Sequence, residues 1–238
     1  PLLELLLSCR WLADLQPAIA AKVMQGEELS TFAVEGHGSL AAGRIEGQVT
    51  VPFAAACRWL VLPVFEGERQ RIGLIDLRHP GCSHELASQF DLSYDLHKVF
   101  FSVPAGELSR ADPDFPLEAH GVLAVAELVG CTQSCLKWVA QYAKDRIHFG
   151  KPIGSYQAVK HTLANSLMML DNARVASQYL AAAFDNAIAC GWLEDIEASQ
   201  EAMTALHVAK SYASDSARCV VENSIQIHGS IAMSWELK

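Results

Sequence analysis

Residues 146–153 read RIHFGKPI, and this short stretch separates two long segments that have helical periodicity. Apolar residues recur at helical spacing over residues 122–139, 159–188 and 203–227. Gly150 and Pro152 break the first run from the second, and Gly191 breaks the second from the third. Small residues crowd the last two runs, so their backbones can approach closely. The sequence therefore predicts an antiparallel helical bundle in its C-terminal half.

The composition of the RIHFG segment allows two interpretations. Arg146 closes a predicted helix, and its guanidinium can bind a phosphate through two parallel charge-assisted hydrogen bonds, while Phe149 offers a flat apolar face. Alternatively, Arg146 complements the negative C-terminal end of its helix and Phe149 fills a gap in the bundle. These five residues taken alone favour the second, purely structural interpretation.

The first half of the chain has a different pattern. Residues 2–25 have apolar side chains at helical spacing and end at Gly26, which predicts a short helical segment. Residues 31–110 hold β-branched, alternating runs separated by turn-like stretches, of which EGER (66–69) is the best hairpin turn. We expect a small antiparallel β domain here, followed by a linker, ADPDFPLE, at 111–118.

The overall composition excludes several classes of function. The chain has 238 residues, with 18 basic and 27 acidic side chains and a net charge of -9, so it has no global field for recruiting nucleic acid or an anionic membrane. We identified no apolar run of about 20 residues, which predicts no membrane span. Seven scattered cysteines favour free thiols and a cytoplasmic location. The start lacks both a methionine and a secretion signal, so we expect the natural N-terminus to lie upstream.

Two motifs carry a resemblance to a known family. Residues 141–174 (QYAKDRIHFGKPIGSYQAVKHTLANSLMMLDNAR) resemble the acyl-CoA dehydrogenase pattern YA..R..FG.PI...Q.....LA. Further along, QIHGSIAMSWE (226–236) resembles the family's Q..GG.G...E element. The resemblance implies an α+β multi-domain fold: a remnant of an N-terminal α domain (1–30), a middle antiparallel β domain (31–112) and a C-terminal antiparallel helical bundle (113–238), which we expect to be truncated.

The resemblance also implies a reaction and a cofactor. Family members desaturate an acyl-CoA thioester between Cα and Cβ; a carboxylate removes the α proton, and a hydride passes to N5 of FAD. In the family, the residues matching Arg146, Phe149, Gln226 and Gly229 reach across the dimer interface to the ADP half of the neighbour's FAD. These four are the predicted cofactor-binding residues. No metal site is predicted, because His79, Cys82 and His84 lack a fourth ligand.

The catalytic base is not found at the positions that the family uses. One such position would follow Lys238, and the other falls at His120 and Gly121, where some members have glutamate. Glu118 lies two residues away, which is a large change of direction on a helix, and Glu127 suits a structural role better. The catalytic residue therefore stays unknown.

The predicted flavin-ring site departs further from the family. Val34 replaces a threonine, Pro52 and Phe53 stand near the place of a Trp-x-Thr/Ser element, and Trp59 comes too late in its strand. A valine cannot donate a hydrogen bond to the flavin. In the second motif Ala232 replaces a glycine, which predicts a shifted last turn or one unable to take positive φ.

This asymmetry suggests a supporting subunit. The residues that serve a neighbour remain, whereas those that hold the chain's own flavin ring are altered. RIHFGKPIGSYQAVKH and AELVG resemble the branch that forms α2β2 heterotetramers and degrades steroid side chains in bacteria. The alternatives are a catalytically silent structural subunit and a self-sufficient homotetrameric acyl-CoA dehydrogenase whose base lies outside this chain.

Overall fold

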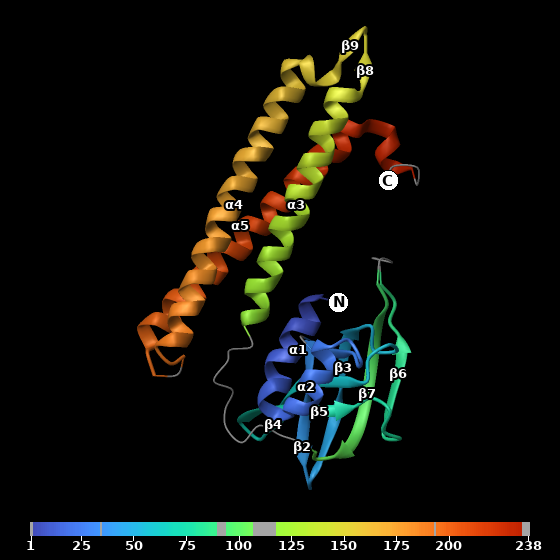
Figure 1. The fold of residues 1–238 in the computed structure, drawn as a ribbon, viewed down its shortest axis with the longest axis vertical. Coiled ribbons are helices and arrows are strands. Elements are labelled where there is room, and N and C mark those ends of the chain that lie inside the picture. The colour runs from blue at the N-terminus through green and yellow to red at the C-terminus, as the bar shows by residue number, and fades with distance from the viewer. Residues whose placement is uncertain (1, 34, 90–93, 107–117, 193, 235–238) are drawn as a thin grey trace. The chain divides into compact units, whose positions relative to one another are not determined.

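The computed structural model describes residues 2–33, 35–89, 94–106, 118–192 and 194–234. The chain divides into two compact units, Pro1–Asp114 and Phe115–Lys238 (Figure 1). Each unit has its own hydrophobic core, so each is described by itself. The boundary predicted between residues 112 and 113 lies outside the described residues, and the three-part division stays a prediction.

The first unit opens with two helices where the sequence predicted one. These are α1 (Leu2–Leu15) and α2 (Pro17–Met24), so the predicted helical segment over residues 2–25 is confirmed but is divided at Gln16. Proline lacks a backbone N–H and fits the first position of a helix, where no partner is needed, so Pro17 starts a new helix. Gly26 follows with a φ of 76°, as a residue beyond a helix end often does.

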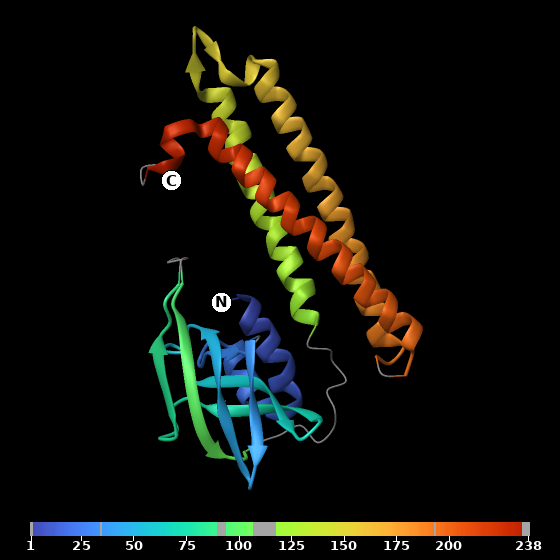
Figure 2. The ribbon, with the colours of Figure 1, turned by 180° about the vertical axis from the view of Figure 1, so that it is seen from behind.

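Seven strands form the sheet beneath these helices. They are β1 (Ser30–Phe32), β2 (Glu35–Ala41), β3 (Arg44–Pro52), β4 (Trp59–Glu66), β5 (Arg69–Asp76), β6 (Cys82–Leu86) and β7 (Leu96–Pro104), in the order β1-β4-β2-β3-β7-β6, with β5 also paired to β4. Helices α1 and α2 lie on one face of the sheet, as the front view and the back view show (Figure 1, Figure 2).

The predicted antiparallel domain needs one correction, because the sheet is mixed. Strand β4 runs parallel to β1 and to β2, while the hairpin pairs β2–β3 and β4–β5 are antiparallel. The predicted EGER turn is confirmed: Glu66 pairs with Arg69, and Gly67 takes a φ of 63°. One cluster of buried side chains, including Ile45, Val49 and Leu62, fills the interior of this unit.

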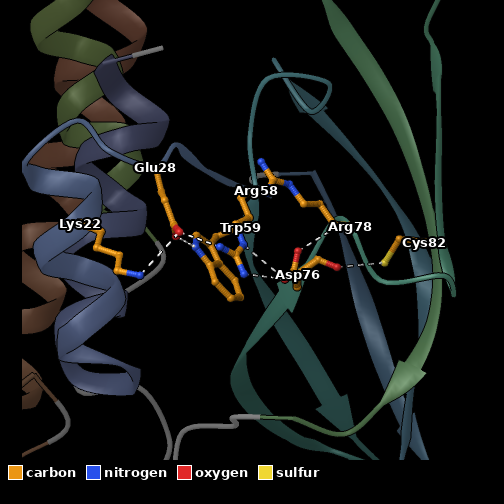
Figure 3. A network of polar contacts seen from close by, with 7 residues as sticks. All are labelled: Lys22, Glu28, Arg58, Trp59, Asp76, Arg78 and Cys82. Carbon is orange, nitrogen blue, oxygen red and sulfur yellow. Dashed lines mark hydrogen bonds and ion pairs between the residues drawn. The ribbon is translucent and has the colours of Figure 1, made fainter.

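A network of polar contacts joins the helical pair to the sheet (Figure 3). Glu28, after α2, accepts hydrogen bonds from Nε1 of Trp59 and from Arg58 at 2.6 Å. Arg58 also lies 3.4 Å from Asp76, and its guanidinium carbon is 4.7 Å from the centre of the Trp59 ring. The hydrogen bond from Trp59, with the charges of Arg58 and Lys22, lowers the pKa of the Glu28 carboxyl.

The second unit is a bundle of three long helices, α3 (Ala119–Asp145), α4 (Gln157–Ala189) and α5 (Ile196–His228). The three predicted helical runs and the breaks between them are confirmed. The α3–α4 connection contains β8 (Ile147–His148), β9 (Lys151–Pro152) and η1 (Ile153–Ser155), and η2 (Gly229–Met233) follows α5. Alanines fill much of the core, including Ala183, Ala202 and Ala209, so the helices approach closely. The α+β fold class is confirmed.

The sequence predicted no membrane-spanning segment, but helix α3 meets the length and composition criteria for one. Within the described residues, His120–Asp145 is long and apolar enough to cross a membrane by length and composition, with a mean hydropathy of 1.3. The helix packs against both α4 and α5, and Val125, Leu136 and Val139 are buried among them. Helix α3 therefore packs as one member of the three-helix bundle, although only 22% of its apolar stretch is buried.

Candidate functional site

The RIHFGKPI stretch forms a tight β-hairpin rather than a plain loop. Ile147 pairs with Pro152 and His148 with Lys151, which leaves Phe149 and Gly150 as a two-residue turn. Both turn residues have positive φ, 49° at Phe149 and 77° at Gly150, as a type I′ turn requires. Glycine takes this conformation freely, but at a phenylalanine it costs about 1 kcal/mol. The sequence analysis missed this turn, because Phe-Gly is not one of its usual dipeptides.

The Phe149 ring does not fill the bundle. Its side chain is 84% exposed, and its one recorded ring contact in the described structure is with the adjacent His148, at 4.2 Å between centroids. The alternative in which Phe149 fills a gap in the bundle is therefore wrong. A strained and exposed aromatic residue is typical of a ligand-contacting position.

Arg146 is the C-cap residue of α3, directly after Asp145. Its backbone N–H donates to Tyr142 O at 2.8 Å, and its carbonyl accepts from the N–H of Ile153 at 2.8 Å, so both sides of its backbone are fixed. Its exposed guanidinium makes no hydrogen bond or ion pair with any residue that the structure describes. The backbone of Arg146 is fixed, and no described residue occupies its guanidinium donors. This side chain is therefore suited to bind an anion from another molecule.

The second motif ends α5. Gly229 has φ 69° and ψ -145°, a region that only glycine populates readily, so the chain leaves the helix here without a side chain in the way. Gln226 is exposed one turn earlier. Ala232, which replaces a family glycine, lies in η2 and does not have a positive φ. The expected inability of Ala232 to take positive φ therefore has no consequence in this conformation.

Tyr142 and His228 bring the two motifs to the same end of the bundle. Their ring centroids are 4.5 Å apart, and the Tyr142 hydroxyl lies 3.5 Å from the His228 carbonyl oxygen. Nδ1 of His228 lies 2.8 Å from Ser224 O, so it donates to that carbonyl. Figure 2 shows the β8–β9 hairpin and η2 near one end of the bundle. Arg146 and Phe149 thus share this end with Gln226 and Gly229.

An open groove of about 420 Å³ runs between α3 and α5 beside these motifs. Its walls are Cys135, Trp138, Gln141, Tyr142, Val221, Ser224, Ile225, His228 and Ala232. Trp138 is 64% exposed. The sequence does not predict this exposure, because helical spacing alone does not show which face of a helix is covered.

At the predicted positions of the catalytic base, the described residues identify no catalytic side chain. Glu118 and Glu127 are exposed on α3 or at its start. At Gly121, a Cβ atom would come within 2.7 Å of Cδ1 of the buried Leu206, so this position faces the bundle core. The catalytic residue stays unknown.

The predicted flavin-ring positions also give no replacement for the family's hydroxyl and indole groups. Val34 lies outside the described residues. Pro52 ends β3, and Phe53 begins a turn with a φ of 57°. Trp59 donates its indole N–H to Glu28, so it belongs to the joint between α2 and β4.

Comparisons with known proteins agree with this architecture. The family described as "Acyl-CoA dehydrogenase, C-terminal domain" matches residues 117–238, which is half of the chain. Among curated proteins, "Acyl-CoA dehydrogenase IpdE2" of Mycolicibacterium smegmatis is 31% identical over 134 residues, which cover 56% of this chain. Those residues cover 38% of that relative, so the chain matches well under half of its length.

Solved structures show the same fold at low sequence identity. The ChsE4-ChsE5 complex from Mycobacterium tuberculosis matches with a TM-score of 0.74 at 19% identity, over 98% of this chain and 66% of that chain. A glutaryl-CoA dehydrogenase from Mycobacterium smegmatis in complex with FADH2 matches with a TM-score of 0.76 at 14% identity, over 96% of this chain and 64% of that one. From its fold and its matched C-terminal domain, this chain belongs to the acyl-CoA dehydrogenase family.

Proposed function

We propose that this chain is a subunit of an FAD-dependent acyl-CoA dehydrogenase that desaturates an acyl-CoA thioester between Cα and Cβ. In this assembly it contributes the ADP-side half of a neighbouring subunit's FAD site. The observation that carries the proposal is that one end of the bundle presents both an exposed Phe149 and an Arg146 guanidinium without a hydrogen-bond or ion-pair partner among the described residues.

The residues at this end suit the adenosine diphosphate half of FAD. Arg146 would pair with the pyrophosphate through charge-assisted hydrogen bonds, and Phe149 would supply an apolar face. Gln226 offers both a donor and an acceptor, and Gly229 lets a ligand approach the backbone closely. When bound, the flavin accepts the β hydrogen as a hydride.

The neighbour would supply what this chain lacks. It would hold the flavin ring and the carboxylate that removes the α proton, because neither Gly121 nor the turn at Phe53 offers a suitable group. The ChsE4-ChsE5 complex, which has the same fold, supports pairing with a homologous subunit, and a heterotetramer is the assembly that we propose. A homotetramer whose base lies outside residues 1–238 is the competing proposal, and a silent structural subunit is the third.

Expression alone and with a homologous subunit separates these proposals. We expect visible flavin absorbance and acyl-CoA turnover only when the two polypeptides are expressed together. Stoichiometric flavin with turnover from this chain alone would support the homomeric enzyme. A complex whose flavin content and turnover are unaffected by any change at Arg146 would support the structural subunit.

The first testable prediction concerns Arg146→Ala in the co-expressed complex. Loss of a charge-assisted contact should weaken FAD binding by about 2 kcal/mol, or roughly 30-fold in the dissociation constant. Flavin content after dialysis and titration of the apoprotein with FAD measure this change. The matched control is Arg218→Ala, which removes another exposed guanidinium, from mid-α5, where it pairs only with Asp215 and Glu222 among the described residues. Equal FAD affinity in both variants contradicts the proposal.

A further inference from the structure

We infer that Tyr156 positions the Phe149–Gly150 turn, and through it the cofactor-contacting face of the hairpin. Tyr156 lies just before α4, and its half-buried side chain reaches back along the hairpin. This inference rests on the proposed function, since it assigns a purpose to the orientation of Phe149.

Tyr156 contacts the chain on both sides of the turn. Its hydroxyl donates to the carbonyl oxygen of His148, the residue before the turn, at 3.2 Å. Its ring lies beneath Lys151, the residue after the turn, with Nζ 4.3 Å from the ring centroid. One side chain therefore holds the entry and the exit of the turn, by a hydrogen bond on one side and a cation–π contact on the other.

The base of the hairpin is fixed independently of Tyr156. The N–H of Ile153 donates to Arg146 O at 2.8 Å, and the Ser155 hydroxyl donates to Pro152 O at 2.7 Å. Gly154 lies so close to α3 that a Cβ atom there would come within 2.9 Å of Ala143 O. The contacts of Tyr156 therefore act mainly on the tip, which is where the strain lies.

The free energy of the Tyr156 hydrogen bond is similar in size to the backbone strain energy at Phe149. A single neutral hydrogen bond stabilises a folded state by an amount similar to the cost of a left-handed phenylalanine. Without the hydroxyl, the turn should open more often and Phe149 should sample other orientations. The bundle core contains neither the hydroxyl nor its acceptor, so global stability should hardly change.

Tyr156→Phe tests this inference, because it removes the hydroxyl and keeps the ring beneath Lys151. Amide hydrogen exchange of the chain should become about five-fold faster at residues 147–151 and stay unchanged in the body of α3 and α5. In the co-expressed complex the dissociation constant for FAD should rise by a similar factor. At saturating FAD, kcat should stay within about two-fold of the parent, because a positioning residue for the cofactor takes no part in the chemistry.

The matched control is Tyr179→Phe, which removes a hydroxyl bonded to Glu201 at 2.6 Å between α4 and α5. It should change neither the hairpin exchange nor the affinity for FAD. If amide hydrogen exchange at residues 147–151 is unchanged in Tyr156→Phe, the inference is overturned. It is also overturned if this exchange becomes faster while the affinity for FAD stays the same. Arg146→Ala separates the two ideas: if that variant binds FAD normally, the proposed function fails, whereas the exchange experiment still decides whether Tyr156 holds the turn.

Discussion

At the scale of single residues, Phe149 shows a conflict between local stability and function. Asparagine followed by glycine is the dipeptide that a type I′ turn prefers, yet the chain has phenylalanine at the first position. The exposed ring contributes nothing to the bundle core that would offset the cost of its left-handed backbone. Its presence fits the proposed contact with the cofactor of a neighbouring subunit.

Phe149→Asn should therefore raise stability and lower function together. We expect the hairpin to gain about 1 kcal/mol, seen as slower amide exchange at residues 147–151, because asparagine tolerates positive φ. FAD retention in the co-expressed complex should fall, because the apolar face is lost. Phe149→Ala is the control, since it removes the ring and keeps the strain: it should lose FAD without slowing exchange. Faster exchange in Phe149→Asn contradicts the assigned turn type.

The sequence identified candidate residues at this end but not how they are held. Arg146, Phe149, Gln226 and Gly229 are the candidates that the resemblance to the family implies. The contact between Tyr156 and His148 and the strained turn were not, because both depend on a backbone conformation that phenylalanine rarely adopts. The exposure of Phe149 likewise depends on which way the hairpin projects.

At the scale of elements, local signals predicted the helices well and the sheet less well. Gly150 and Pro152 mark the break between α3 and α4, and Gly191 marks the break between α4 and α5; these signals lie within a few residues of the helix ends. The start of a second helix at Pro17 was not predicted, because the apolar spacing continues across this residue. The parallel pairing of β4 with β1 and β2 joins strands far apart in sequence, and no local pattern encodes it.

Two glycines, one in the α3–α4 connection and one within α3, allow an element-level prediction. Gly154→Ala should destabilise the bundle by about 1–3 kcal/mol, because the new Cβ would collide with the backbone oxygen of Ala143. Gly130→Ala is the matched control within α3: nothing lies within 4 Å of its Cβ position, so the change should stabilise the helix by about 0.5–1 kcal/mol. Denaturant titrations followed by circular dichroism measure both changes, and effects of the same sign contradict the close approach of η1 to α3.

At the scale of the whole molecule, each unit has its own core, and the polar joint at Glu28 ties the helical pair of the first unit to its sheet. The pKa of Glu28 is lowered in the folded state, so its contribution to stability is present above about pH 4.3, the usual pKa of glutamate, and is lost as the pH falls through the lowered folded-state pKa.

Glu28→Gln should consequently lower the melting temperature at pH 7. This effect should shrink below about pH 4.3, where the carboxyl is protonated first in the unfolded state and then, at the lowered pKa, in the folded state. Calorimetric melts from pH 7 to pH 3 measure this difference. Glu68→Gln, at an exposed residue of the β4–β5 turn, serves as the control and should have little effect at any pH. A difference between parent and Glu28→Gln that stays constant across this range contradicts the role of the charge.

Position 121 lies against Leu206 in the bundle core. A Cβ atom there would come within 2.7 Å of Leu206 Cδ1, so a glutamate at position 121 would require this buried side chain to move. A carboxylate introduced at position 121 is therefore coupled to the packing of α3 against α5, and any test of a base at this position has to follow the stability of the bundle as well as turnover.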